Sequence, residues 1–189
     1  MLRETGTFEP METRSPWRTP ANGVTLLRLL LAPVLAAAII AGASLPATVI
    51  FFVAVITDVA DGYIARRFGT SSPIGGLIDH AVDAVFVTVA SAALAIEQVL
   101  PALLPPLIAV AFLQYAVDSR AGVSRSLRAS SLGRVNGVAY FVAVAVPIVR
   151  DALQLGWPAP GLVRAFGWLL VATTLASMID RWLVSRRRV

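Results

Sequence analysis

Six apolar runs, each roughly as long as a membrane span, constrain this chain more than any other feature. A transmembrane helix needs about 20 consecutive, mostly apolar residues. Turn-forming or charged residues separate the runs, and the sequence contains no internal repeat. The sequence therefore predicts an all-α, polytopic membrane protein with about six transmembrane helices. The predicted spans are Val24–Ala43, Leu45–Ile64, Gly75–Ile96, Val99–Val117, Val135–Leu155 and Leu162–Leu183.

Composition supports the same fold class. Of 189 residues, 57% are hydrophobic and 14% are charged, and the mean hydropathy is +0.77. Soluble domains are about 45–50% apolar and about 25% charged, so the surplus apolar surface of this chain must face lipid. The absence of cysteine excludes disulfides and thiolate chemistry. A pI near 10.9 would suggest nucleic acid in a soluble protein. Here the basic residues cluster at the ends of the apolar runs, so we expect no nucleic-acid partner.

The distribution of arginine predicts the orientation in the membrane. If both termini are cytoplasmic, the cytoplasmic segments hold thirteen arginines and the opposite face holds only Arg150 and Arg164. This is a strong positive-inside bias. We therefore expect a multi-pass protein of the cell (inner) membrane, with residues 1–21 as a cytoplasmic N-terminal segment, 22–185 as the six-helix domain and 186–189 as a basic tail. The cytoplasmic arginines are Arg3, Arg14, Arg18, Arg66, Arg67, Arg120, Arg125, Arg128, Arg134, Arg181, Arg186, Arg187 and Arg188.

Four aspartates lie at the predicted cytoplasmic ends of the second and third spans. Asp58 and Asp61 are three residues apart and Asp79 and Asp83 are four apart, so each pair shares one helical face. A short loop between the spans brings the two pairs face to face. Four carboxylates at a membrane edge repel one another and need a compensating cation. Hard divalent ions with oxygen ligands, Mg²⁺ or Mn²⁺, suit such a site, and four acids are enough for two ions.

Small residues accompany the first aspartate pair. Gly62 and Ala65 lie on or beside the face of Asp58 and Asp61, which leaves room for a flat ligand against the backbone. Arg66 follows at the membrane edge, where its guanidinium can bind phosphate. This arrangement suits a pyrophosphate chelated by metal.

The pattern D-x2-D-G-x2-A-R-x8-G-x3-D-x3-D resembles the signature of the CDP-alcohol phosphotransferase (CDP-alcohol phosphatidyltransferase) family. Upstream, Pro20-Ala21-Asn22, Thr25 and Arg28 resemble the P-N-x2-T-x2-R stretch of the family's first helix, with Ala21 as an insertion. The resemblance extends to the six-helix length and so covers nearly the whole chain. The eight fixed positions that match are Asp58, Asp61, Gly62, Ala65, Arg66, Gly75, Asp79 and Asp83.

The resemblance implies a reaction and a role for each matching residue. A substituted phosphate would pass from a CDP-linked donor, CDP-diacylglycerol, to a hydroxyl acceptor with release of CMP, as in phospholipid biosynthesis. Asp58, Asp61 and Asp79 would hold the metals on the pyrophosphate, while Asp83 would complete the metal site and act as the general base. A homodimer is also implied by the family. The residues implied to bind the donor nucleotide are Thr25, Gly62, Ala65, Arg66 and Gly75.

The acceptor is the least constrained substrate. Arg125 and Arg128, in the loop between the fourth and fifth spans, either bind a phosphorylated acceptor or serve only as topology signals. Glycerol 3-phosphate is our first candidate, and inositol phosphate, inositol, serine and phosphatidylglycerol are alternatives. The chain has Gln114-Tyr115 and Gly133–Gly137 where the phosphatidylglycerophosphate synthase branch usually shows Arg-Glu and G-K-x-K-T.

Three further features have competing interpretations. Arg28, one turn inside the first span, either extends to the lipid headgroups or belongs to the site. For His80 a packing or surface role is favoured over a catalytic one. The aspartates would also serve a metal-ion transporter, but Glu97 and Asp151 are the only acids near the opposite face. Acids gathered at one face favour an enzyme.

Overall fold

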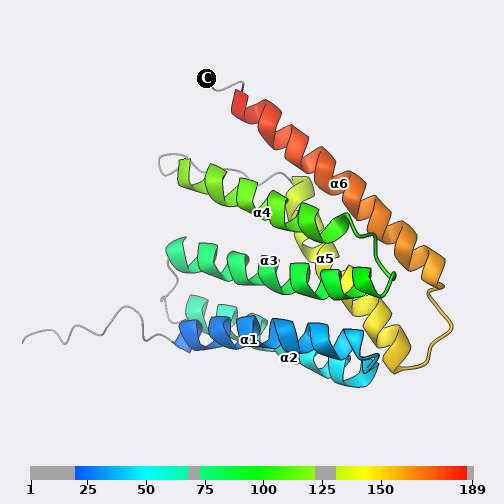
Figure 1. The fold of residues 1–189 in the computed structure, drawn as a ribbon. Coiled ribbons are helices and arrows are strands. Elements are labelled where there is room, and N and C mark those ends of the chain that lie inside the picture. Colours follow the sequence, from blue (N-terminus) through cyan, green and yellow to red (C-terminus); the bar gives the residue numbers. More distant parts are fainter. Residues whose placement is uncertain (1–19, 68–72, 122–130, 187–189) are drawn as a thin grey trace, which may run out of the picture.

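The computed structural model describes residues 20–67, 73–121 and 131–186, and over these ranges the chain is entirely helical (Figure 1). The predicted all-α fold is confirmed, and each predicted span overlaps one helix, although the first and fifth spans were predicted to end three residues too late. The helices are α1 (Pro20–Ile40), α2 (Ser44–Arg67), α3 (Pro73–Ile96), α4 (Leu104–Ala121), α5 (Ser131–Ala152) and α6 (Pro160–Arg186).

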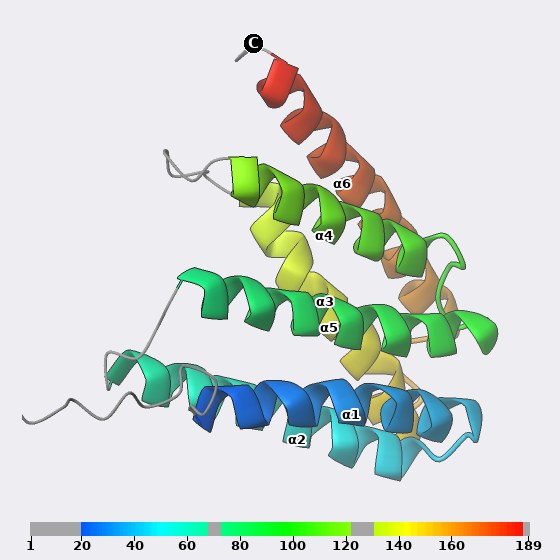
Figure 2. The same cartoon turned by 60° about the vertical axis from the view of Figure 1, so that its left-hand side comes forward.

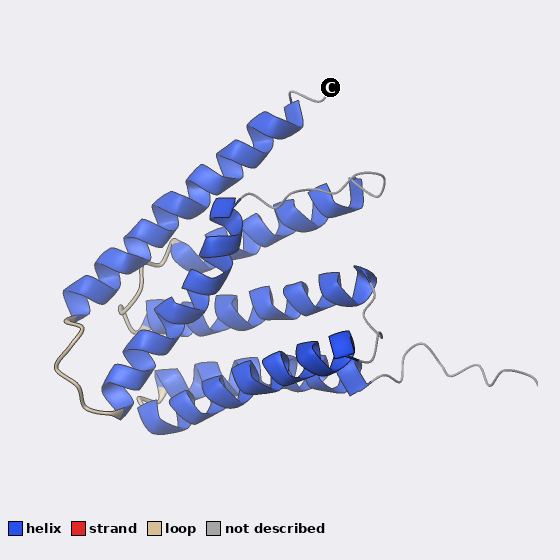
Figure 3. Cartoon of the chain, turned by 180° about the vertical axis from the view of Figure 1, so that it is seen from behind, coloured by secondary structure: helices blue, strands red, loops and turns tan. Residues whose placement is uncertain are grey.

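Helix α3 is at the centre of the bundle and packs against α1, α4 and α5. Figure 1 shows the antiparallel α1–α2 pair on one side of α3 and α4 on the other, with α6 beyond α4. Helix α5 crosses the bundle obliquely and contacts α2, α3 and α6, which is clearest in Figures 2 and 3. The central position of α3 means that its polar residues face several helices at once.

The outer surface of the bundle is apolar, as a lipid-facing surface must be. Leu30, Ile56 and Val138 are 60%, 62% and 69% exposed. Exposed apolar side chains of this kind would promote aggregation in water. In a bilayer they face lipid, and this lowers the free energy of the folded protein. Three helical segments are long and apolar enough to span a membrane, and shorter apolar helices occupy the rest of the bundle. The long segments are Gly76–Ile96, Leu132–Ala152 and Pro160–Val184, and the shorter ones are Leu27–Ile40, Ser44–Ala60 and Leu104–Val117. The chain is therefore a multi-pass membrane protein.

Helices α1, α3 and α5 end with the same backbone motif. In α1, the N–H of Ala43 donates to the carbonyl of Ala38 at 2.9 Å, and the N–H of Gly42 donates to that of Ile39 at 3.0 Å. Gly42 takes a φ of 66°, and Gln98 and Gln154 take φ values of 58° and 52° at the equivalent positions. This Schellman arrangement satisfies carbonyls that would otherwise lack partners near the lipid. All three turns lie at the same end of the bundle (Figure 1).

The predicted start of the fourth span at Val99 is wrong by five residues, because α4 begins at Leu104. The N–H of Val99 donates to the carbonyl of Leu94 at 2.8 Å and so belongs to the end of α3. Pro101 then disfavours helix at the residue before it. Pro105 and Pro106 occupy the first turn of α4, where an N–H has no intrahelical acceptor and proline is tolerated.

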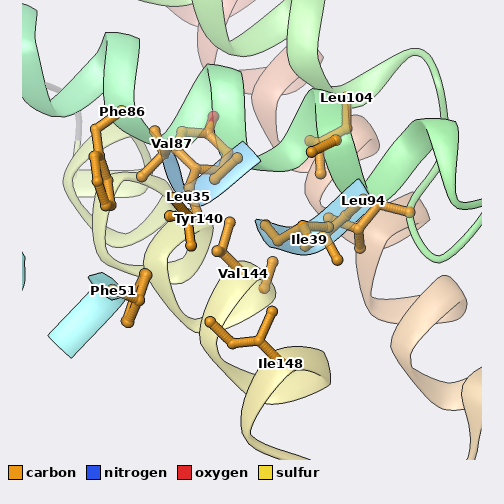
Figure 4. Close-up of a cluster of buried hydrophobic side chains, with 14 of the residues drawn as sticks. Leu35, Ile39, Phe51, Phe86, Val87, Leu94, Leu104, Tyr140, Val144 and Ile148 are labelled. Atoms are coloured by element: carbon orange, nitrogen blue, oxygen red, sulfur yellow. The ribbon is translucent and has the colours of Figure 1, made fainter. Parts of the chain in front are cut away.

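An apolar core joins all six helices. Leu35, Phe86 and Val144 are fully buried within it (Figure 4). The rings of Phe86 and Phe141 stack with centroids 6.4 Å apart, and Phe51 lies 6.1 Å from Phe86. This packing fixes the relative positions of the helix ends, where the aspartates lie.

The alternation of the helices predicts which loops share a side. Reporter fusions at residues 70, 125 and 189 should report the cytoplasm, and fusions at 44, 98 and 158 the opposite side. The activities of paired alkaline phosphatase and fluorescent-protein fusions measure this directly. A single fusion on the wrong side would contradict the six-span topology.

Candidate active site

Three of the four predicted aspartates converge in space. Asp58 near the end of α2 meets Asp79 and Asp83 in the first turns of α3, and one carboxylate oxygen from each lies within 4.8 Å of the others. The helical spacing explains this, because Asp79 and Asp83 are one turn apart and project from the same face. Asp61 follows Asp58 by one turn on α2, but its side chain is outside the described residues.

Arg28 of α1 lies at the centre of this carboxylate cluster. Its guanidinium donates through Nη1 to Asp79, at 3.4 Å, and to Asp83, and through Nη2 to Asp58. The Arg28 side chain is only 2% exposed, so it does not extend to the headgroups and belongs to the site. The sequence left these two roles equally open. One feature of the sequence favoured the site: Arg28 lies within one turn of the membrane face at which the four aspartates are predicted to lie.

The cluster meets the chemical requirements of a divalent-cation site. Three ionised carboxylates against one guanidinium leave two negative charges uncompensated. Converging carboxylate oxygens are the ligands that Mg²⁺ and Mn²⁺ prefer. The side chains of Asp58, Asp79 and Asp83 are 30%, 43% and 23% exposed, so the cluster can be reached from outside the bundle. The residues present therefore fit a divalent ion.

A cavity of about 550 Å³ begins at Asp83 and extends between α3, α4, α5 and α6. Its wall is largely apolar, and we call it the polar cavity after the polar side chains that interrupt this wall. Asp83 is the one described member of the carboxylate cluster that lines it. The other polar lining residues are His80, Gln114, Tyr115, Arg134, Asn136, Tyr140, Thr174, Ser177 and Arg181.

Some polar atoms in the cavity wall lack partners among the described residues. Asn136 is 3% exposed, and its Nδ2 has no hydrogen-bond partner there. Gln114 donates from Nε2 to the carbonyl of Met178 at 3.1 Å, which leaves its Oε1 without a donor. The hydroxyls of Tyr140 and Thr174 share a bond of 2.6 Å. Because buried polar groups are normally satisfied, a hydroxylated ligand suits this cavity.

The cavity contains two arginines that the sequence had assigned only to topology. Arg134 enters from the start of α5, and Arg181 enters from α6, where its guanidinium carbon lies 5.4 Å from the centroid of the Tyr115 ring. Tyr115 also meets His80 edge-on at 6.1 Å, which agrees with a packing role for this histidine. Arg125 and Arg128, the predicted acceptor residues, lie outside the described residues.

The predicted nucleotide-binding residues are only partly visible. Gly62 lies on α2 directly after Asp61. Thr25, Ala65, Arg66 and Gly75 lie on α1, α2 and α3, but their side chains are outside the described part of the chain. Their roles stay predictions.

Residues 18–179 match the profile of the CDP-alcohol phosphatidyltransferase family. The chain belongs to this family. Across the family the reaction generally depends on a divalent metal, which agrees with the carboxylate cluster. The family membership also agrees with the membrane-type helices, because its members use a CDP-alcohol donor and an alcohol acceptor in a membrane lipid environment.

Two curated relatives align with parts of the chain. The cardiolipin synthase (CMP-forming)/mitochondrial hydrolase fusion protein of Schizosaccharomyces pombe is 35% identical over 106 residues, which is 51% of this chain and 18% of the relative. The CDP-diacylglycerol–glycerol-3-phosphate 3-phosphatidyltransferase of Blochmanniella floridana is 37% identical over 70 residues, which is 35% of this chain and 37% of the relative. The alignments thus span less than half of either relative's length.

The contacts of Arg28 predict a large effect on stability. Replacing Arg28 with Leu leaves three carboxylates without their shared cation and should lower the free energy of unfolding by about 3 kcal/mol in metal-free buffer. Added Mn²⁺ should recover part of the loss, because the ion supplies the missing positive charge. Denaturant unfolding in mild detergent, with and without Mn²⁺, measures both effects.

Arg150→Leu is the matched control. Arg150 pairs with the exposed Asp151 at 2.7 Å, at the other end of the bundle. Arg150 also donates to the carbonyl of Pro158 at 3.3 Å, but its one acidic partner is half exposed, so its loss should cost less than that of Arg28 and should not respond to Mn²⁺. Equal losses in the two variants would contradict the central role of Arg28.

Proposed function

We propose that this protein is a membrane phospholipid-synthesis enzyme that transfers a phosphatidyl group from CDP-diacylglycerol to a small hydroxyl acceptor, releasing CMP. Glycerol 3-phosphate is the first candidate acceptor. The observation that carries the proposal is the position of Asp83, which belongs both to the carboxylate cluster and to the wall of the polar cavity. A donor bound at the cluster and an acceptor bound in the cavity would meet at this residue.

The donor end of the proposed site consists of the carboxylates and the residues near them. Asp58, Asp61 and Asp79 would hold the donor pyrophosphate through divalent ions, with Asp83 completing the ligand set. Two Mg²⁺ or Mn²⁺ ions, when bound, would neutralise the phosphates and polarise phosphorus. The nucleotide would be bound by the residues that the family pattern assigns to it, Thr25, Gly62, Ala65, Arg66 and Gly75.

The transfer itself needs a proton acceptor close to the attacking hydroxyl. The acceptor oxygen would form a bond to the phosphatidyl phosphorus as the bond from that phosphorus to the CMP oxygen breaks, so that CMP leaves with the electron pair. The proton of the hydroxyl would pass to a carboxylate oxygen of Asp83. Among the described aspartates, only Asp83 lines both the cluster and the cavity, which supports this assignment.

The cavity suits an acceptor that carries both hydroxyls and a phosphate. Arg134 and Arg181 would supply charge-assisted hydrogen bonds to the phosphate. Gln114 and Asn136, each with an unsatisfied polar atom, would contact hydroxyls. Arg125 and Arg128 stay predicted contributors from the neighbouring loop. Inositol phosphate shares this chemistry, whereas inositol and serine lack the phosphate and phosphatidylglycerol adds two acyl chains.

The orientation and membrane are also proposals. The arginine distribution supports a cytoplasmic active face in the inner cell membrane, with 22–185 as the membrane domain. A homodimer stays a family-based prediction. A metal-ion transporter gains no support. The described acids at the opposite end are Glu97, which is exposed, and Asp151, which is paired with Arg150, and the core between them and the cluster is apolar.

Two aspartate variants separate the proposed roles. Asp58→Asn should abolish turnover and weaken Mn²⁺ binding, because it removes a metal ligand. Asp83→Asn should lower kcat by at least about a hundredfold, the low end of what a general base contributes, while the Kd for CDP-diacylglycerol, which the other metal ligands still support, changes much less than kcat. Steady-state rates of CMP release and calorimetric binding of donor measure the difference. If donor affinity fell as far as rate in Asp83→Asn, Asp83 would be a binding ligand and not the base.

Arg181 tests the acceptor end. Arg181→Gln should raise the acceptor KM by roughly tenfold or more, as expected for a lost charge-assisted bond, and leave the donor KM unchanged. Arg181→Lys should retain part of the affinity. Arg164→Gln, at the opposite membrane face, is the matched control and should leave both constants unchanged.

The identity of the acceptor follows from a panel assay. Purified protein with CDP-diacylglycerol and Mn²⁺ should release CMP fastest with glycerol 3-phosphate or another phosphorylated polyol, compared with inositol, serine and phosphatidylglycerol. CMP release that needs no acceptor, or ion flux in liposomes without CMP release, would contradict the proposed activity. A preference for serine or free inositol would contradict the phosphate-binding role of Arg181.

A further inference from the structure

A second hollow lies outside the proposed substrate path. It is an open groove of about 640 Å³ between α5 and α6, and we call it the α5–α6 groove. Phe166 lines it from α6. The lining residues from α5 are Arg134, Val135, Val138, Ala139 and Val142. None of these residues belongs to the carboxylate cluster.

The groove is apolar except at one end. Val135, Val138 and Val142 are 63%, 69% and 43% exposed, and their spacing places them along one face of α5. From Val135 to Val142 this face is about 10 Å long, at 1.5 Å per residue. Arg134 stands in the first turn of α5, at the same end of the bundle as Asp83, and has no ion pair or hydrogen bond with any described residue. The groove thus presents a cation at the membrane surface and hydrocarbon below it.

The groove and the polar cavity share a wall. Arg134 and Val138 line both hollows, whereas Val142 lines the groove alone. The Arg134 side chain therefore borders both the lipid-facing groove and the cavity in which we place the acceptor. An anion bound on one side reduces its availability on the other.

We propose that the α5–α6 groove binds an anionic diacyl phospholipid of the surrounding bilayer, which competes with the acceptor for Arg134. The lipid phosphate contacts the guanidinium, and one acyl chain lies along the three valines and Phe166. Charge complementarity favours this occupant, because the anionic headgroup matches Arg134 and the hydrocarbon matches the apolar lining residues of the groove. The predicted effect of the lipid on acceptor affinity rests on the proposed function. The reaction product is itself an anionic phospholipid, so its accumulation in the membrane lowers the affinity for the next acceptor molecule.

The test compares nanodiscs of phosphatidylcholine alone with nanodiscs in which part of the lipid is replaced by phosphatidylglycerol. We expect the KM for glycerol 3-phosphate to rise by about tenfold with the anionic lipid, as for a lost charge-assisted bond, with the donor KM unchanged. Val142→Trp fills the groove without touching the cavity. It should abolish the part of this rise that depends on the groove while keeping the wild-type KM in neutral discs.

Val110→Trp on α4 is the matched control, because Val110 is 47% exposed and lines neither hollow. Anionic lipid also repels an anionic acceptor through the surface potential, and that effect is common to all variants. The difference between Val142→Trp and Val110→Trp therefore isolates the groove. An equal rise in KM in the two variants would overturn the proposal.

Native mass spectrometry supplies a readout that is independent of activity. Wild type and Val110→Trp should retain phosphatidylglycerol after detergent removal, and Val142→Trp should lose it. Equal retention by all three proteins overturns the lipid site. A change from dimer to monomer in Val142→Trp with unchanged lipid retention overturns it too and makes the groove a contact between copies. If no protein releases CMP in any disc but retention differs as expected, the proposed function fails and the lipid site stands.

Discussion

The structure depends on one buried cation among three acids. Arg28 on α1 contacts Asp58 on α2 and both Asp79 and Asp83 on α3, so a single side chain ties three helices together at one membrane face. Arg28 is buried and the three acids are only partly exposed, so water solvates these charges incompletely and each acid would be costly without the guanidinium. The same contacts leave an excess of negative charge, which a divalent cation can neutralise. The residues that tie the helices together are thus the same ones that we propose to bind metal, and this accounts for the charges at one end of an otherwise apolar bundle.

The central helix α3 divides the site into two halves. Its first turns place Asp79 in the cluster and Asp83 on the boundary between the cluster and the cavity. The remaining walls of the cavity come from α4, α5 and α6, which diverge enough to enclose a volume of about 550 Å³. In the proposed function, helices α1 and α2 would bind the donor, the last three helices would bind the acceptor, and α3 would contact both. The apolar core begins at Phe86, one turn after Asp83 on α3, and supports this geometry from directly below the site.

The helices and three aspartates were predictable from local patterns, because hydrophobic length and the spacing of acids act within one or two turns. Contacts between segments that are distant in the sequence were not predictable from such patterns. Arg28 could be assigned to the site only from the packing of α1 against α3. The separation of residues 28 and 83 along the chain does not show that they are in contact. Arg134 and Arg181 looked like topology signals because the sequence does not show that α5 and α6 enclose a cavity. The start of α4 was missed since a run of apolar residues hides a Schellman turn at Gln98, which glutamine forms at a positive φ of 58° without a glycine to mark it.

The most direct test of the central claim is the location of bound Mn²⁺ in the protein. Crystals grown with Mn²⁺ and measured at the manganese absorption edge should show an anomalous peak within about 2.2 Å of carboxylate oxygens of Asp58, Asp79 and Asp83, since hard divalent ions bind oxygen ligands near this distance. The Arg28 guanidinium should then lie beside the ion and not among the three carboxylates. An anomalous peak elsewhere in the bundle, or none at the cluster at saturating Mn²⁺, would contradict the account.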